Sequence, residues 1–258
     1  MNYMTAGKWL VLSLLSGLIA ACVSSGTGLG NKDMESAAAY NLQLGIDYFR
    51  QGNLSEAKEK LDRSLEQNPR NTQAYVASGM LYDRLGEPRK ADRYFAKAVS
   101  MEPENAEVIN SYAVFLCRKG DYAKGEQMAL QAAANPLYKT PEAAYLNAGN
   151  CALDAGRNVN AEEHFRRALS LRPNFAAALL QMAELEFNAG NYLPSRGFLE
   201  RFQQVSKPTA ASLWLLVRVE YALGNSGLSA DYARRLKEDF PTSLETKALL
   251  ELEKRKQS

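Results

Sequence analysis

Apolar residues recur at helical spacing along almost the whole chain beyond residue 34. In the segment 38–50, Leu42, Ile46 and Phe49 form one apolar stripe on the expected helix, and Leu44 and Tyr48 belong to a second stripe. A helix with two apolar stripes needs two partners to cover them. The pattern therefore predicts an all-α protein in which short helices pack on one another.

Glycines and prolines divide this helical pattern at a regular period. The glycines that would follow the first helix of each unit are Gly52, Gly86, Gly120, Gly156, Gly190 and Gly224, and their successive intervals are 34, 34, 36, 34 and 34. The prolines that would follow the second helices are Pro69, Pro103, Pro136, Pro173, Pro208 and Pro241. A helix–turn–helix unit of about 34 residues is the signature of the tetratricopeptide repeat (TPR).

We therefore expect a right-handed superhelical solenoid of about six TPR repeats. The repeats should lie near 38–71, 72–105, 106–141, 142–175, 176–209 and 210–243. Gly45, Gly79 and Gly149 fall inside first helices, where they would let two helix backbones approach. Repeat three departs from the pattern, with Gly125 where alanine is usual and two extra residues near 137–139. A polar capping helix, begun by Ser243 as its N-cap, should close the TPR domain of residues 35–258.

The segment 1–34 has a different character. Lys8 precedes a 13-residue run without charge, Trp9 to Ala21, which is typical of a secretory signal. As a helix this run would span roughly 20 Å, too short for a hydrocarbon core of roughly 30 Å. The small residues before Cys22 resemble the bacterial lipobox, so we expect a signal peptide at 1–21, an acylated Cys22 and a flexible tether at 22–34. An ordinary signal peptide with an incidental Cys22 is the alternative.

Candidate chemistry is sparse. The formal net charge of +2 gives no attraction to nucleic acid, and the single histidine, His164, cannot build a multi-histidine metal site. We expect it to be a surface or half-buried helical residue. Cys117 and Cys151 form no C-x-x-C motif, so we expect small buried hydrophobes, and a disulfide or a reactive thiol is the alternative. The sequence predicts no catalytic residue, metal, cofactor or small-molecule substrate.

A partner is expected on the concave face of the solenoid. In TPR proteins, positions 2, 5, 9, 12 and 13 of each repeat usually face a groove, and Ala38 is position 1 here. These positions hold Ala39, Leu42, Ile46, Phe49 and Arg50 in repeat one, and Gln73, Val76, Met80, Asp83 and Arg84 in repeat two. The candidate binding residues are Leu42, Ile46, Phe49, Val76 and Met80.

The stripe of Leu42, Ile46 and Phe49 has two interpretations. Neighbouring repeats or the tether could cover it, or it forms an exposed patch that accepts an apolar helix or strand of another protein. The TPR domains that hold acidic C-terminal tails use Lys and Asn at groove positions. Leu42 and Ile46 stand there instead, so such a tail is not the expected ligand.

Three segments resemble the PilF/PilW family of type IV pilus biogenesis lipoproteins. They are the lipobox, the stretch AAAYNLQLGIDYFRQGNLSEAKEKLDRSLEQNP at 37–69, and NSYAVFLCRKGDYAKGEQMALQAAANPLY at 110–138. The resemblance implies a pilotin, an outer-membrane lipoprotein that binds subunits of the pilus secretin and promotes their localisation and multimerisation. Val23 agrees with the outer membrane, because the aspartate of an inner-membrane retention signal is absent. Two rivals are an adaptor lipoprotein for the cell wall or another envelope machine, and an envelope hydrolase, which lacks visible catalytic residues.

Overall fold

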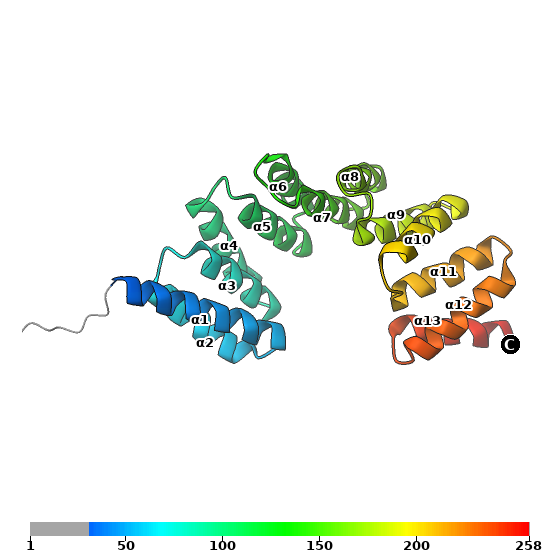
Figure 1. Cartoon of the computed structure of the whole chain (residues 1–258), viewed down its shortest axis with the longest axis horizontal. Helices are drawn as coiled ribbons and strands as arrows, with labels where there is room; N and C mark the ends of the chain where they lie inside the picture. Colours follow the sequence, from blue (N-terminus) through cyan, green and yellow to red (C-terminus); the bar gives the residue numbers. More distant parts are fainter. Residues whose placement is uncertain (1–30, 258) are drawn as a thin grey trace, which may run out of the picture.

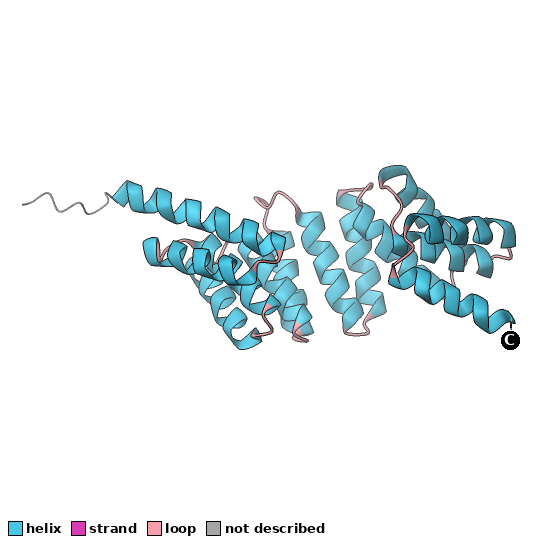
Figure 2. Cartoon of the chain, turned by 90° about the horizontal axis from the view of Figure 1, so that it is seen from below, coloured by secondary structure: helices cyan, strands magenta, loops and turns pink. Residues whose placement is uncertain are grey.

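The computed structural model describes residues 31–257, and all the regular structure in that range is helical (Figures 1 and 2). The helices are α1 (Asn31–Gln51), α2 (Leu54–Gln67), α3 (Thr72–Arg84), α4 (Pro88–Met101), α5 (Ala106–Arg118), α6 (Tyr122–Ala134), α7 (Pro141–Asp154), α8 (Asn158–Leu171), α9 (Ala176–Asn188), α10 (Tyr192–Val205), α11 (Ala210–Ala222), α12 (Ser226–Asp239) and α13 (Leu244–Gln257).

The first twelve helices form six helix pairs, and α13 packs on the last pair. The pairs follow one another in an arch, with α7 on the inner side of α6 and α8 (Figure 1). Most first helices also contact the first helix of the next repeat: α1 contacts α3, α3 contacts α5, α5 contacts α7 and α9 contacts α11. The expectation of an all-α TPR solenoid closed by a further helix is confirmed.

The predicted glycines and prolines end the helices. All six glycines of the periodic series have positive φ, from 72° at Gly86 to 90° at Gly120. This left-handed conformation suits glycine because it has no Cβ. Each predicted proline follows the end of a second helix by two or three residues, as Pro69 follows Gln67. Ser243 accepts a hydrogen bond from the backbone N–H of Thr246 at 3.1 Å, which confirms the expected cap of α13.

The glycines inside the first helices lie where a second helix approaches closely. A Cβ on Gly79 would lie 2.8 Å from Cδ2 of Phe95 on α4, and a Cβ on Gly45 would lie 2.8 Å from Cγ of Leu61 on α2. Phe95 in turn stacks on Phe115 of α5, with 5.1 Å between the ring centroids. The core is therefore continuous from one repeat to the next, which a single helix pair could not achieve.

The two ends of the described range differ from each other. Helix α1 begins at Asn31, so the last four residues of the predicted tether, 31–34, are helical. The predicted signal peptide, Cys22 and the rest of the tether lie outside the described residues. At the other end, Lys247, Glu251 and Lys254 of α13 are exposed, which suits a helix that no further repeat covers.

Candidate partner-binding surface

The groove positions of repeats five and six contact one another. Arg218 and Glu184, both at position 9 of their repeats, form an ion pair of 3.0 Å between Nη2 and Oε1. The Arg218 guanidinium also lies over the ring of Phe187, at position 12 of repeat five, 4.6 Å from its centroid. Residues at the same position of neighbouring repeats, such as Glu184 and Arg218, therefore lie next to each other in the structure.

Four of the five predicted binding residues reach this surface at least in part. Met80 is 39% exposed, and Leu42, Ile46 and Phe49 are half-buried. Val76 is only 6% exposed, because it packs in the core with residues of α4 and α5. Its side chain therefore offers little surface to a partner, unlike the other four.

The predicted apolar stripe of repeat one is partly covered by repeat two. Leu42 and Phe49 pack against a buried cluster that includes Leu61 of α2 and Leu81 of α3. Of the two interpretations of the stripe, coverage by the next repeat therefore applies to these two side chains. Ile46 and Met80 do not belong to this cluster, so they are the apolar groove residues that it does not cover.

A second part of the inner face, which we did not expect, forms a cavity of about 760 Å³ in the C-terminal half. Its walls are mainly apolar and aromatic, and its residues include Phe187, Trp214, Arg218, Tyr221, Ala248 and Leu252. Arg218 lies between two of these rings, because it is also 5.4 Å from the centroid of Trp214. The signal was present in the sequence: the groove positions extended to repeats five and six select Phe187, Trp214 and Tyr221.

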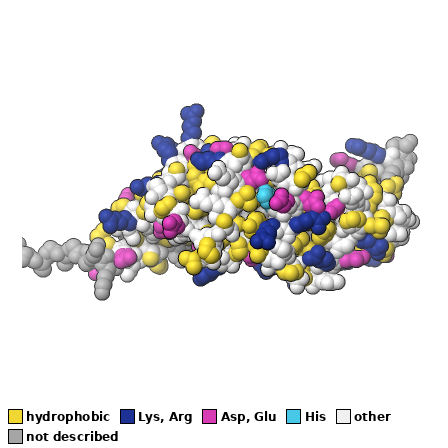
Figure 3. Space-filling model, turned by 90° about the horizontal axis from the view of Figure 1, so that it is seen from above, with side chains coloured by type: hydrophobic (Ala, Val, Ile, Leu, Met, Phe, Trp, Pro, Cys, Tyr) yellow, Lys and Arg dark blue, Asp and Glu magenta, His cyan; other side chains and the backbone are white. Residues whose placement is uncertain are grey.

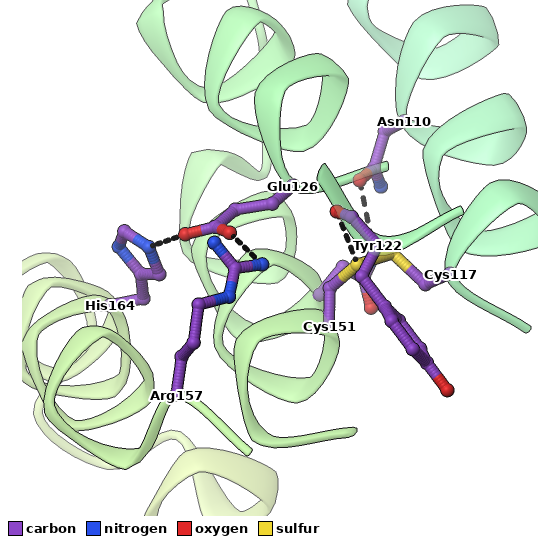
Figure 4. Close-up of a disulfide and its surroundings, with 8 residues drawn as sticks. Asn110, Cys117, Tyr122, Glu126, Cys151, Arg157 and His164 are labelled. Carbon is purple, nitrogen blue, oxygen red and sulfur yellow. Dashed lines mark hydrogen bonds and ion pairs between the residues drawn. A yellow bond between two sulfur atoms is a disulfide. The ribbon is translucent and has the colours of Figure 1, made fainter. Parts of the chain in front are cut away.

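Cys117 and Cys151 form a disulfide, contrary to the sequence-based expectation (Figure 4). Both residues are buried as expected, but α5 and α7 lie side by side, with 5.3 Å between the two Cα atoms. Gly125 on α6 makes room for the bridge, since a Cβ there would collide with Sγ of Cys117. The departure from alanine at position 125 thus has a local cause.

His164 was expected at a surface or half-buried position, and it is instead 8% exposed. Its Nε2 donates to Oε1 of Glu126 over 2.8 Å, and Oε2 of Glu126 forms an ion pair with Nη2 of Arg157 at 2.5 Å (Figure 4). Glu126 is itself buried on α6, so two donors from repeat four satisfy a carboxylate of repeat three. The hydrogen bond between His164 and Glu126 explains how a polar histidine can be buried on α8.

The described residues contain no cluster of three or more His, Cys, Asp or Glu side chains that could hold a metal ion. None of the helices in the described range is long and apolar enough to cross a membrane. On the face seen from above in Figure 3, acidic and basic side chains are interspersed, which agrees with the small net charge of the chain.

The repeat architecture, six helix pairs that follow one another along the chain, defines a TPR solenoid protein. Tetratricopeptide repeat models match residues 38–71, 72–105 and 118–178. The type IV pilus assembly protein PilF of Pseudomonas aeruginosa is 31% identical over 245 residues, which are 94% of this chain and 97% of that protein. The chain therefore belongs to the PilF family of type IV pilus assembly proteins.

Two solved structures agree with this assignment. The structure of Pseudomonas aeruginosa PilF matches with a TM-score of 0.72 and 30% identity, over 84% of this chain and 98% of that one. The structure of PilW, a widely conserved type IV pilus biogenesis factor, matches with a TM-score of 0.74 and 30% identity, over 83% and 98% of the two chains. The resemblance to the PilF/PilW family inferred from three sequence segments is confirmed.

Proposed function

We propose that this protein is an outer-membrane lipoprotein scaffold of type IV pilus assembly, a pilotin. It binds subunits of the pilus secretin and promotes their localisation and multimerisation in the outer membrane. The observation that carries the proposal is the likeness to PilF along 94% of the chain. The stacked repeats support a role in binding protein, since solenoids of this kind build extended binding surfaces.

The anchor of this scaffold is Cys22, on the periplasmic face of the outer membrane. One acyl chain binds a bilayer only marginally, whereas the several chains of a bacterial lipoprotein make the attachment effectively permanent. Nine residue steps separate Cys22 from the start of α1 at Asn31, and an extended chain of that length reaches about 30 Å. The first repeats therefore work close to the membrane.

Confinement and capture act together in this scheme. The anchor restricts the solenoid to one leaflet, which raises the local concentration of any bound secretin subunit there. An apolar segment of the subunit held against Ile46 and Met80 is shielded from aggregation until subunits assemble. Neither step requires a chemical reaction, so the scaffold needs no cofactor.

Removal of the acylation site tests the anchor. In a strain that carries Cys22→Ala, we expect the protein to leave the outer-membrane fraction and secretin multimers to disappear from unheated gels. Ser25→Ala, three residues further along, is the matched control and should change neither result. Normal multimers with a mislocalised Cys22→Ala protein would remove the anchor from the proposal.

Substitution on the groove tests secretin binding. We expect Ile46→Asp to reduce co-purification of the secretin while circular dichroism shows unchanged helicity. Leu193→Asp places the same charge at an apolar residue of α10 that is 67% exposed and lies outside the groove positions. Equal recovery of secretin with both variants would move the binding site away from repeat one.

A deletion strain distinguishes the scaffold from a general envelope adaptor. Loss of secretin multimers with an intact cell wall agrees with the proposal. Intact multimers with a defect in the cell wall or another envelope machine would assign the protein to that machine and reject the pilotin role.

A further inference from the structure

The groove positions of the N-terminal half include a row of arginines. Position 13 of the first helix is an arginine in repeats one, two and three, namely Arg50, Arg84 and Arg118, and all three are exposed. The row stops at repeat three. The equivalent residues of repeats four, five and six are Asp154, Asn188 and Ala222.

Helix electrostatics alone do not account for this row. A cation in the last turn of a helix does interact favourably with the helix dipole. Yet α7, α9 and α11, the first helices of the later repeats, have no basic residue in their last turn. These helices form without one, so a basic residue at this position is not required for a first helix to form.

An apolar row runs parallel to the arginines, one helical turn away. Position 9 holds Ile46, Met80 and Val114 in repeats one to three, each four residues before an arginine. Met80 is 39% exposed, and the other two are half-buried. In the later repeats the same position is polar, with Asn150, Glu184 and Arg218.

The arginines are only partly neutralised by the protein itself. Arg118 pairs with Asp83 of the preceding repeat at 2.9 Å between Nη2 and Oδ2, which also shows that the row is continuous from α3 to α5. Arg50 meets Asp47 of its own helix at 3.6 Å, and its side chain is 72% exposed. Arg84 forms no ion pair with any residue in the described range. Three arginines and two acidic partners leave one positive charge, that of Arg84, unpaired among the residues that the structure describes and beside apolar side chains.

We propose that these two rows bind a segment of a partner protein in which carboxylates recur beside apolar side chains. The inference rests on the proposed function, because it specifies the chemistry of the segment that the scaffold captures. Complementary charge fixes the register of the segment on the groove, while the apolar row supplies contact area. The carboxylates lie within the segment, so this mode differs from the clamp that holds an acidic C-terminal tail.

The spacing of the repeats limits the segment further. Packed helices lie about 8–10 Å apart, so successive arginines should be separated by about that distance. Carboxylates three residues apart in an extended chain, or seven apart in a helix, are spaced by about 10 Å. A flat anionic bilayer fits less well, because the repeats follow one another in an arch and not in a plane (Figure 1).

Peptide binding to the purified full chain tests the inference. One labelled peptide carries Leu and Glu at three-residue spacing, a second carries them at seven-residue spacing, and each has a counterpart with Lys in place of Glu. We expect one of the Glu peptides to bind, its Lys counterpart to bind at least about tenfold more weakly, and salt to weaken binding of the Glu peptide. Fluorescence anisotropy gives the dissociation constants.

Two matched variants locate the effect. Arg84→Glu should weaken binding of the Glu peptide by about three- to tenfold, the range expected for one exposed charge pair turned into a repulsion. Asn188→Glu introduces the same side chain at the equivalent exposed position of repeat five and should leave binding unchanged. The inference is overturned if neither Glu peptide binds, if the Lys peptides bind equally well, or if Asn188→Glu weakens binding as much as Arg84→Glu.

Other occupants and the proposed function give separate results. If the wild-type protein binds phosphatidylglycerol vesicles and Arg84→Glu does not, the arginine row binds the membrane. If the wild-type protein self-associates and Arg84→Glu does not, the row binds a second copy of this chain. Either outcome rejects the inference. Secretin that co-purifies equally with wild type and Arg84→Glu also rejects it and leaves the proposed function standing. If secretin does not co-purify with the wild-type protein, the proposed function is rejected. The peptide titration then still shows whether the arginine row binds carboxylates.

Discussion

Cys117 on α5 and Cys151 on α7 are joined across the boundary between repeats three and four, at the point where the regular period is broken. The two extra residues of repeat three lie in the connection between α6 and α7. Because of them, the two cysteines occupy different positions of their repeats although one full period separates them. The disulfide therefore holds together two first helices whose register is not set by the regular repeat.

Removal of this disulfide should destabilise the protein substantially. The bridge closes a chain separation of 34 residues, for which the loss of unfolded-state entropy corresponds to about 4 kcal/mol. We expect the Cys117→Ala, Cys151→Ala double variant to unfold at lower denaturant concentration than the oxidised wild type. The reduced wild-type protein should match the variant. Equal midpoints for the oxidised protein and the variant would show that packing alone holds the boundary.

The buried Glu126 should be the second stabilising element at this boundary. Glu126→Ala leaves the buried His164 without its hydrogen-bond partner and frees Arg157, and we expect a loss of about 1–3 kcal/mol in the free energy of unfolding. Glu162→Ala on α8 removes a more exposed ion pair, to Arg166, and should cost under about 1 kcal/mol. Chemical denaturation of both variants checks the order, and a larger loss for Glu162→Ala would contradict it.

The fold could be predicted from sequence because its determinants are local and periodic. Gly52 and Gly86 end helices because their backbones adopt positive φ. Gly79 lacks a Cβ and so leaves room for Phe95 on the next helix of the chain. Such signals need no knowledge of distant contacts. Their regular repetition along the chain then fixes the architecture.

The chemistry at the boundary could not be predicted in the same way. Glu126 and His164 are 38 residues apart and lie on second helices of different repeats, so no spacing rule connects them. Cys117 and Cys151 meet because of the irregular length of repeat three, which the regular pattern does not describe. Val76 occupies a groove position by sequence and yet is buried, because it packs against residues of α4 and α5. The position of a residue within its repeat does not show how closely the neighbouring helices pack around it.

Gly79 and Gly197 should respond in opposite ways to the same substitution. Gly79→Ala gains helix propensity, but its Cβ would lie 2.8 Å from Phe95, and overpacking of this kind costs about 1–3 kcal/mol. Gly197, inside α10, has nothing within 4 Å of an added Cβ, so Gly197→Ala should stabilise by about 0.5–1 kcal/mol. Melting temperatures of the two variants test this contrast. A stable Gly79→Ala variant would mean that the two helices can move apart at little cost.

Asp92 should make the contact between α4 and α5 sensitive to acid. Burial opposes ionisation of this carboxylate, but hydrogen bonds from Lys119 at 2.7 Å and Tyr112 at 3.0 Å outweigh it and hold the pKa of Asp92 below its usual value. A lowered pKa in the folded state means that the unfolded chain binds the proton more readily. The stabilisation is therefore present above the unfolded pKa of about 3.9 and is lost as the pH falls through the folded pKa.

Asp92→Asn should accordingly lower the melting temperature at pH 7 and have a smaller effect near pH 3, where the wild-type carboxylate is becoming protonated. Lys119→Met removes the shorter of the two hydrogen bonds and should reproduce part of this pattern. The difference in melting temperature between wild type and each variant, followed from pH 7 to pH 3, measures the contribution of the contact. A difference that stays constant or grows toward pH 3 would show that Asp92 does not stabilise the helix pair through its charge, and that its hydrogen bonds to Tyr112 and Lys119 act independently of ionisation.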